Sequence, residues 1–179
     1  GLKFLSHSGA FMLGAATCFM LIPSLDAAVI VLTNGIPIGV PETLCRQFVD
    51  LMETGRLTQD WWSLYSEKIA PLMAPTGSLL GQQPPPAPQP PGALQRYAGS
   101  YDNAYHGPVQ VSLVDNRLQL SIGPQAQTYV LQHWSGGQFC FVPGNESAAP
   151  HSISLAVFEA GDAAPAQSLW LEFYDDDGL

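Results

Sequence analysis

The sequence predicts a mainly β chain, and three observations indicate this class. Apolar residues make up 46% of the 179 residues, and charged residues make up only 12%. The chain contains 17 glycines and 16 prolines, which favour strands and turns over long solvated helices. Short blocks of alternating apolar and polar residues recur through the second half, and a period of two is the pattern of a half-buried strand.

Three apolar segments at the start of the chain predict a three-stranded antiparallel sheet. They run from Lys3 to Phe11, from Ala16 to Ile22 and from Ala27 to Thr33, and Gly14 and a turn over residues 23–26 separate them. The run from Ala28 to Leu32 is uninterrupted and largely β-branched, which is typical of a strand covered on both faces.

One or two helices should follow this sheet. Pro41 and Glu42 open the first, Gly55 closes it, and its apolar residues at helical spacing are Leu44, Phe48, Leu51 and Met52. A second helical stretch from Thr58 to Ala70 carries Trp61, Trp62, Tyr65 and Ile69. We therefore treat residues 1–74 as one predicted domain with both strands and helices.

A proline-rich segment predicts a domain boundary over residues 75–93. Its prolines are Pro84, Pro85, Pro86, Pro88, Pro90 and Pro91. At this density prolines favour the polyproline II conformation, so residues 83–91 should form a semi-rigid spacer of roughly 28 Å at ~3.1 Å per residue. Binding of this segment in an aromatic-lined groove is the alternative, and a plain linker is the commoner use of such a sequence.

Residues 94–179 predict an antiparallel barrel or sandwich. Val109, Val111 and Leu113 alternate with polar residues, Asp115 and Asn116 supply a tight turn, and a second alternating block, from Leu118 to Ile122, completes a hairpin. Further blocks lie at residues 97–101, 129–131, 139–142, 153–158 and 169–174. Seven or more regularly spaced strands are the pattern of a small barrel or sandwich.

Charge and residue spacing exclude several classes of function. Six basic and 15 acidic residues give a formal charge of −9, which would repel a nucleic acid backbone. The cysteines (Cys18, Cys45 and Cys140) and the histidines (His7, His106, His133 and His151) show no metal-ligand spacing. We expect no metal, no cofactor and no nucleic acid partner. The apolar run from Ala10 to Ile22 is shorter than the ~20 residues that span a bilayer.

Three segments taken in order carry a family resemblance. They are Leu5 to Phe11, which contains His7-Ser8-Gly9, then Cys18 to Pro23, then Val29 to Gly35, which ends in Leu-Thr-Asn-Gly. Followed by a helix, they resemble the C-terminal part of serine hydrolases of the β-lactamase and penicillin-binding-protein type. In the esterase and peptidase branches of that family, His-Ser-Gly or His-Thr-Gly often replaces the Lys-Thr-Gly motif of the strand that lines the active site. The resemblance extends from about residue 2 to residue 56.

This resemblance implies catalytic roles for His7, Ser8, Gly9 and Ala10. Gly9 would leave the strand bare so that an acyl group can lie against it, and the Ala10 N–H would be one of two donors to the developing oxyanion. His7 and Ser8 would hydrogen-bond the acyl-enzyme or a substrate carboxylate. The parent protein would then be a periplasmic or secreted hydrolase that acts on peptides, D-amino-acid amides or small esters through an acyl-enzyme.

The nucleophile of that family lies in an S-x-x-K motif upstream of this strand, and the present chain contains no such motif. Tyr101-Asp102-Asn103 matches the family's Y-x-N element by letter, but it follows the proline-rich segment, and we interpret it as a coincidence. His7 and Ser8 cannot form a dyad, because neighbouring residues of a strand point to opposite faces. We therefore expect the chain alone to be inactive.

A second resemblance begins at Leu94. The sequence Tyr97-Ala98-Gly99-Ser100-Tyr101 and the strand after it resemble the opening of the lipocalin-like barrel, of about eight strands, that is often appended to this family. In that family the barrel is thought to mediate assembly or to shape access to the active site. Tyr97, Tyr101, Tyr105 and His106 would line a ligand rim, or form part of a plain aromatic core. A non-enzymatic barrel for ligand binding or oligomerisation is the alternative function.

We also expect the chain to form a homo-oligomer through residues 1–56. In the fold that this region resembles, further strands and helices cover the sheet, so the edges and one apolar face should be bare here and should pair with a second copy. Lysine at Val29 and Val31 would then disrupt the contact. Alternatively, the barrel or the helix with Trp61 and Trp62 folds back over that face.

Overall fold

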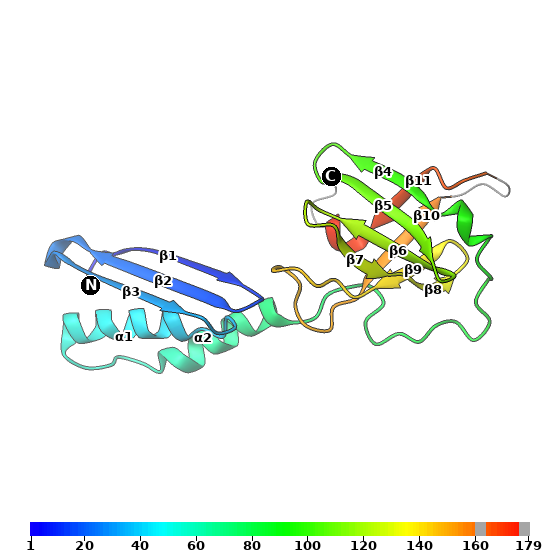
Figure 1. Cartoon of the computed structure of the whole chain (residues 1–179). Helices are drawn as coiled ribbons and strands as arrows, with labels where there is room; N and C mark the ends of the chain where they lie inside the picture. Colours follow the sequence, from blue (N-terminus) through cyan, green and yellow to red (C-terminus); the bar gives the residue numbers. More distant parts are fainter. Residues whose placement is uncertain (160–163, 176–179) are drawn as a thin grey trace. The chain divides into compact units, whose positions relative to one another are not determined.

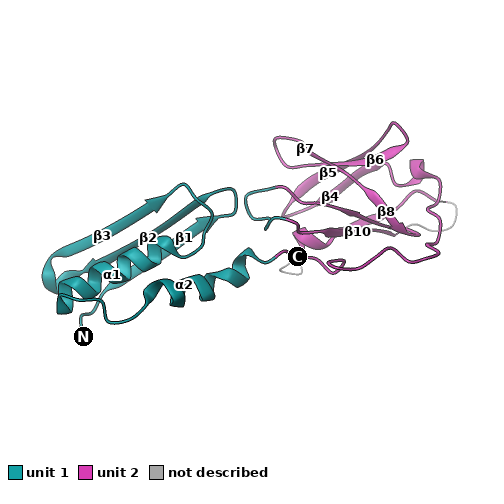
Figure 2. Cartoon of the chain, turned by 90° about the horizontal axis from the view of Figure 1, so that it is seen from below, with its two compact units in different colours: residues 1–74, 145–150 teal, residues 75–144, 151–179 magenta. Residues whose placement is uncertain are grey.

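The computed structural model of the chain describes residues 1–159 and 164–175 (Figure 1). The chain divides into two compact units, which are described separately (Figure 2). Unit 1 comprises residues 1–74 and 145–150, and unit 2 comprises residues 75–144 and 151–179. Within the described ranges, no helix is long and apolar enough to cross a membrane.

Unit 1 contains the predicted three-stranded antiparallel sheet. Strands β1 (Leu5–Phe11), β2 (Ala15–Ile22) and β3 (Ala27–Thr33) pair in the order β1-β2-β3. A short 3-10 turn over Pro23–Leu25 links β2 to β3 and ends at Asp26, whose φ of 46° is left-handed. Cys18 of β2 lies opposite Ser8 in β1 and opposite Val31 in β3, so these three side chains share one face of the sheet.

Helix α1 (Val40–Thr54) packs on that face, against β2 and β3 (Figure 1). From the sheet, Cys18, Met20 and Ile22 are buried in this core, and from the helix, Cys45 and Val49. The predicted helix is therefore present, but its predicted apolar stripe was wrong. Leu44, Leu51 and Met52 are exposed and Phe48 is only partly buried, because the sheet takes up the neighbouring face of the helix.

Helix α2 (Trp61–Ile69) and α1 are joined by a buried carboxylate. The α2 helix begins at Asp60, whose side chain accepts a hydrogen bond from the Ser63 N–H. The Asp50 carboxylate of α1 accepts three 2.7 Å hydrogen bonds, from the Thr58 N–H, the Thr58 hydroxyl and the Trp61 indole. These bonds fix the connection between the helices at a side chain that is almost fully buried. A 3-10 turn, Ala70–Met73, follows α2.

The opposite face of the sheet in unit 1 is apolar and exposed, and we call it the bare face. It is formed by Leu5, Leu21, Ile30 and Leu32, and the exposed fractions of Leu5, Ile30 and Leu32 are 64%, 66% and 73%. The expectation that β3 is covered on both faces was therefore wrong for this chain. The β-branched run of β3 reflects a preference for the strand conformation and does not indicate burial on both faces. No described element of unit 1 covers the bare face.

In its described residues, unit 2 has eight antiparallel strands in two sheets, which confirms the mainly β prediction. The first sheet has the order β4-β5-β6-β7 and the second has the order β11-β10-β9-β8. The strands are β4 (Gly99–Asn103), β5 (Gly107–Val114), β6 (Arg117–Ile122), β7 (Gln127–Val130), β8 (Gln132–Ser135), β9 (Gln138–Phe141), β10 (Ser154–Glu159) and β11 (Ser168–Leu171). In the described residues, strand pairing forms two sheets and no continuous ring.

The chain passes from one sheet to the other at Leu131, the single residue between β7 and β8. Its N–H still donates to the Leu118 carbonyl at 2.9 Å, so the bend keeps its backbone hydrogen bond. The inner faces of both sheets meet in one core, where Tyr97, Phe139 and Phe158 pack with ring centroids 5.0–5.6 Å apart. Strands β4 and β11 lie at the other end of this arrangement as sheet edges.

The segment predicted as a linker is hydrogen-bonded to the rest of unit 2. The Thr76 carbonyl accepts from the Ile153 N–H at 2.9 Å, and the Gln89 carbonyl accepts from the Gly136 N–H at 2.7 Å. Gly77 lies at the first of these contacts with a φ of 125°, and a Cβ there would come within 1.7 Å of the Ile153 carbonyl oxygen. Only glycine permits this approach. The 3-10 turns of unit 2 are Leu94–Arg96 and Glu172–Tyr174.

Asp50 should stabilise unit 1 in a pH-dependent way. Burial raises the pKa of Asp50, but the hydrogen bonds from Thr58 and Trp61 and the charge of Arg46 outweigh it, so the pKa lies below its ordinary value. This stabilisation is fully present above the unfolded pKa of about 3.9 and is lost as the pH falls through the lower folded value. Asp50→Asn should therefore lower the free energy of unfolding by ~2 kcal/mol at neutral pH, measured by urea denaturation.

The difference between the original chain and Asp50→Asn should shrink when the titration is repeated below pH ~4. Asp26→Asn is the matched control, because Asp26 lies in a surface turn whose left-handed conformation asparagine also adopts. An Asp50→Asn effect that is the same at both pH values would contradict the assignment.

Gly77→Ala should destabilise unit 2 by at least ~2 kcal/mol, because it strains the backbone and breaks the contact between Thr76 and Ile153. Gly99→Ala is the control, since its Cβ would meet nothing within 4 Å. Thermal melting followed by circular dichroism compares the two variants. Equal melting temperatures for the two variants would contradict the close contact between Gly77 and the Ile153 carbonyl.

Candidate functional site

The four motif residues lie together on β1, an edge strand of unit 1. They divide between the two faces of the sheet. His7 pairs with Phe19 and stacks on its ring at a centroid distance of 6.2 Å, on the bare face. Ser8 pairs with the buried Cys18, on the face that α1 covers. This placement agrees with the argument that His7 and Ser8 cannot form a dyad.

Gly9 and Ala10 leave the middle of this edge strand open. A Cβ on Gly9 would meet only the Thr17 hydroxyl, at 3.4 Å, which is ordinary contact. The fold of unit 1 therefore does not need glycine at this position. Because an edge strand has alternate N–H and C=O groups without a strand partner, β1 can accept an extended acyl group or peptide along its free side.

Glu42, in the first turn of α1, contacts Ser8 on the face of the sheet that α1 covers. The Ser8 hydroxyl donates a hydrogen bond to the Glu42 Oε1 atom. Glu42 is only 9% exposed, and its other carboxylate oxygen has no hydrogen-bond partner among the described residues. The N-terminal end of a helix favours a negative charge, so the position compensates part of the cost of burial. Ser8 is thereby fixed in its orientation.

Sequence reasoning recognised Glu42 only as a helix-opening residue. A signal was present, since Glu42, Cys45 and Val49 are three and seven residues apart and lie on one helical face. A charged residue on the buried stripe of a helix indicates a specific partner on the sheet.

The thiols near this site are not activated nucleophiles. Burial raises the pKa of Cys18 to about 12, with further contributions from Cys45 and Glu42. Burial also raises the pKa of Cys45, against opposing hydrogen bonds. A thiol in this state carries almost no thiolate at neutral pH. Among the described residues, no group of three or more histidine, cysteine, aspartate or glutamate side chains could hold a metal ion.

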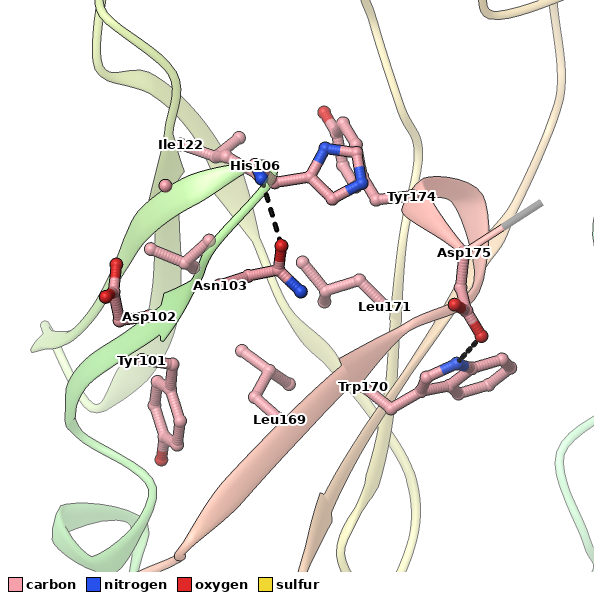
Figure 3. A pocket seen from close by; sticks show the side chains of 12 residues that line it. Tyr101, Asp102, Asn103, His106, Ile122, Leu169, Trp170, Leu171, Tyr174 and Asp175 are labelled. Carbon is pink, nitrogen blue, oxygen red and sulfur yellow. Dashed lines mark hydrogen bonds between the residues drawn. The ribbon is translucent and has the colours of Figure 1, made fainter. Parts of the chain in front are cut away.

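Unit 2 has a pocket of its own, between the edge strands β4 and β11 (Figure 3). Its volume is about 150 Å³. Val109, Ile122, Leu169 and Leu171 give it an apolar wall, and the polar and aromatic lining comes from Tyr101, Asp102, Asn103, His106, Trp170, Tyr174 and Asp175. A second hollow beside Tyr101, Asp102 and Leu169 lies along the same two segments. The pocket therefore follows the seam where the two sheets are not paired.

Two local hydrogen-bond arrangements shape the rim of this pocket. The Asn103 Oδ1 atom accepts from the N–H groups of Tyr105 and His106 at 2.8 and 3.0 Å, which turns its amide nitrogen towards Leu171 (Figure 3). The Trp170 indole donates to the Asp175 Oδ2 atom at 2.5 Å. The His106 ring lies edge-on to the Tyr174 ring at a centroid distance of 5.9 Å.

The structure separates the four residues predicted for a ligand rim. Tyr101 and His106 line the pocket, and burial raises the pKa of Tyr101. Tyr97 is buried in the core, and Tyr105 is exposed and outside the lining. The residues that sequence reasoning missed are Asp102, Asn103, Trp170 and Asp175. No pattern links the first two to the last two, which are almost 70 residues further along the chain.

Comparison with known proteins gives two matches. The chain is similar to the crystal structure of the C-terminal domain of penicillin binding protein Rv0907, with 46% sequence identity over 55% of this chain and 91% of that chain and a TM-score of 0.48. A search of curated proteins gave no significant match. The model of the family described as a domain of unknown function, DUF3471, matches residues 83–174, which is more than half of the chain. The chain therefore belongs to the DUF3471 family.

Proposed function

We propose that this chain is the C-terminal part of a serine acyl hydrolase of the β-lactamase and penicillin-binding-protein type. The observation that supports this most strongly is the accessible edge strand β1, which carries His7, Ser8, Gly9 and Ala10 in sequence. The parent protein would be periplasmic or secreted and would act on peptides, D-amino-acid amides or small esters. Unit 2 would be an accessory domain for assembly or substrate access.

In this proposal β1 forms one wall of the acyl site. A serine hydroxyl from an S-x-x-K segment of the parent protein attacks the substrate carbonyl carbon, and an amine or alcohol leaves once it has gained a proton. The free N–H groups of β1 stabilise the negative charge on the carbonyl oxygen. Water then attacks the acyl-enzyme and releases the acid.

The contact between Ser8 and Glu42 supports this assignment. A serine on an edge strand is normally free to rotate, whereas here a buried carboxylate fixes the hydroxyl. Gly9 supports it in a different way, because the fold would accept a side chain at this position. A glycine that the fold does not need is consistent with a ligand that passes close to the backbone.

The bare face supports the proposal that the chain by itself associates with a second copy through residues 1–56. Leu5, Ile30 and Leu32 are far more exposed than strand residues of a packed sheet. Burying ~800 Å² of apolar surface in a dimer would contribute roughly 20 kcal/mol before the cost of association, which is about 4–15 kcal/mol. The difference, roughly 5–16 kcal/mol, includes the ~8 kcal/mol that corresponds to micromolar dimerisation.

The chain alone should not react with a fluorophosphonate probe or hydrolyse nitrocefin or p-nitrophenyl esters, because it supplies no activated serine. The full-length protein encoded by the longer reading frame should be labelled by the same probe. Stoichiometric labelling of the chain alone, or an upstream sequence without S-x-x-K, would contradict the proposed function.

In the full-length protein, Gly9→Val should slow acylation by the probe at least tenfold, since its side chain would stand on the bare face of β1, where the acyl group is proposed to pass along Gly9. Its melting temperature should change little, because a Cβ at Gly9 makes only the ordinary contact with the Thr17 hydroxyl. Gly35→Val is the matched control, because a Cβ at Gly35 meets nothing within 4 Å. Acylation that is unaffected by Gly9→Val would exclude β1 from the acyl site.

The chain alone should have the mass of a dimer at micromolar concentration, measured by light scattering. Ile30→Lys combined with Leu32→Lys should convert it to a monomer, because both side chains lie on the bare face. Val29 and Val31 are not suitable positions, because they pack against the core beneath α1. Val142→Lys, an exposed position in unit 2, is the control. A monomeric mass for the original chain would refute the dimer.

A further inference from the structure

The Ser8 hydroxyl can accept a hydrogen bond from a ligand, but its own proton is already used. The hydroxyl donates to the Glu42 Oε1 atom, and the Thr17 carbonyl, at 3.3 Å, is a second acceptor for the same proton. Among the described residues, nothing donates to the Ser8 Oγ atom in return. Ser8 is exposed, so the lone pairs of this oxygen are open to a ligand. A ligand group that meets Ser8 must therefore be a hydrogen-bond donor.

The Glu42 carboxylate adds a negative charge to this contact. Glu42 is only 9% exposed, its Oε2 atom has no hydrogen-bond partner, and it forms no ion pair in the described part of the chain. Arg46, one turn further along α1, lies instead over the rings of Phe4 and Trp61, at 4.8 and 4.3 Å from their centroids. The N-terminus of the helix offsets roughly half a unit charge. The surroundings of Ser8 therefore attract a cation and repel a carboxylate.

The order of the motif residues on β1 places this acceptor along the path of the acyl group. In the proposed function the Ala10 N–H binds the oxyanion and the acyl group passes along Gly9, so its far end reaches Ser8. Residues two apart on a strand lie about 7 Å from each other and share one face of the sheet. An extended ligand along a strand edge projects its groups to both faces. A group that projects towards the face covered by α1 meets Ser8.

We infer that Ser8 and Glu42 select substrates whose acyl group carries an ammonium group about 7 Å from the reacting carbonyl. The ammonium group donates a hydrogen bond to the Ser8 Oγ atom. Glu42 is a positioning residue, because it holds the Ser8 proton and attracts the charge without touching the substrate. A substrate carboxylate at this place would find no donor, so the selection differs from the carboxylate contact that the family resemblance implies for Ser8. The inference rests on the proposed hydrolase function and narrows its substrate class.

Three methyl esters test this selection in the full-length protein: methyl 6-aminohexanoate, methyl heptanoate and monomethyl pimelate. They share one methylene chain, which ends in an ammonium, a methyl and a carboxylate group respectively. Hydrolysis consumes one water and releases methanol, which proton NMR measures. The kcat/KM for the aminohexanoate should exceed that for the pimelate at least tenfold. The uncharged heptanoate is the reference for the activity of each preparation.

Two variants should reduce the ratio of kcat/KM between the aminohexanoate and the pimelate at least threefold. Glu42→Gln removes the charge and keeps an acceptor for the Ser8 hydroxyl, and Ser8→Ala removes the oxygen that accepts from the ammonium group. Glu67→Gln, at an exposed position of α2, removes the same charge elsewhere and should leave the ratio unchanged. A folding defect lowers kcat/KM for all three esters together, so a change in the ratio reports selection.

The outcomes separate this selection from the proposed function. A full-length protein that the fluorophosphonate probe does not label would contradict the proposed function and, with it, the selection. In a labelled protein, failure to hydrolyse the aminohexanoate, equal kcat/KM for the two charged esters or a preference for the pimelate would overturn the selection alone. An unchanged ratio in Glu42→Gln or in Ser8→Ala would do the same.

Discussion

A β-strand presents its side chains alternately to two faces, and each apolar face of a sheet must therefore find its own cover. Unit 2 meets this constraint by placing two four-stranded sheets face to face around Tyr97, Phe139 and Phe158. Unit 1 meets it on one face only, where α1 closes over Cys18, Met20 and Ile22. Where the cover ends, each unit keeps an open surface: the bare face in unit 1 and the pocket between β4 and β11 in unit 2.

The incomplete cover of unit 1 connects its fold to its proposed chemistry. The same strand, β1, is an edge of the sheet and carries Leu5 on the bare face and Ser8 on the covered one. An edge with accessible backbone groups is a hazard in an isolated protein, because it templates pairing with other chains. Such an edge is useful where it forms the wall of a site. The buried Glu42 carboxylate, which fixes Ser8, points the same way, because burying a charge with one unpaired oxygen does not by itself stabilise the fold.

In unit 2 the two sheets share a continuous turn at Leu131, whereas β4 and β11 are left as edges at the other end. The pocket lies along this seam, because inward side chains such as Leu169 and Tyr101 do not fill the space between two unpaired strands. Polar residues of the turn after β4 and of the segment after β11 then form its rim. The pocket of this unit is therefore a consequence of incomplete closure.

Strand positions could be predicted from the sequence, because alternation and turn residues act over a few neighbours. Ala16 to Ile22, Ala27 to Thr33 and the hairpin around Asp115 lie where the pattern placed them. The face of α1 that packs on the sheet could not be predicted in this way. Leu44 and Cys45 both lie on apolar stripes of the helix, and the position of the sheet determines that Cys45 is buried and Leu44 is exposed. The pocket lining also comes from residues far apart in sequence, such as Asp102 and Asp175, and a local pattern does not show that they line one pocket.

The claim that β1 forms the wall of an acyl site has one direct test, a crystal structure of the full-length protein after reaction with a fluorophosphonate probe. The account predicts that the phosphonyl oxygen lies about 2.7–3.1 Å from the Ala10 backbone nitrogen, with the organic group along Gly9. A probe attached to a serine whose surroundings do not include β1 would contradict it.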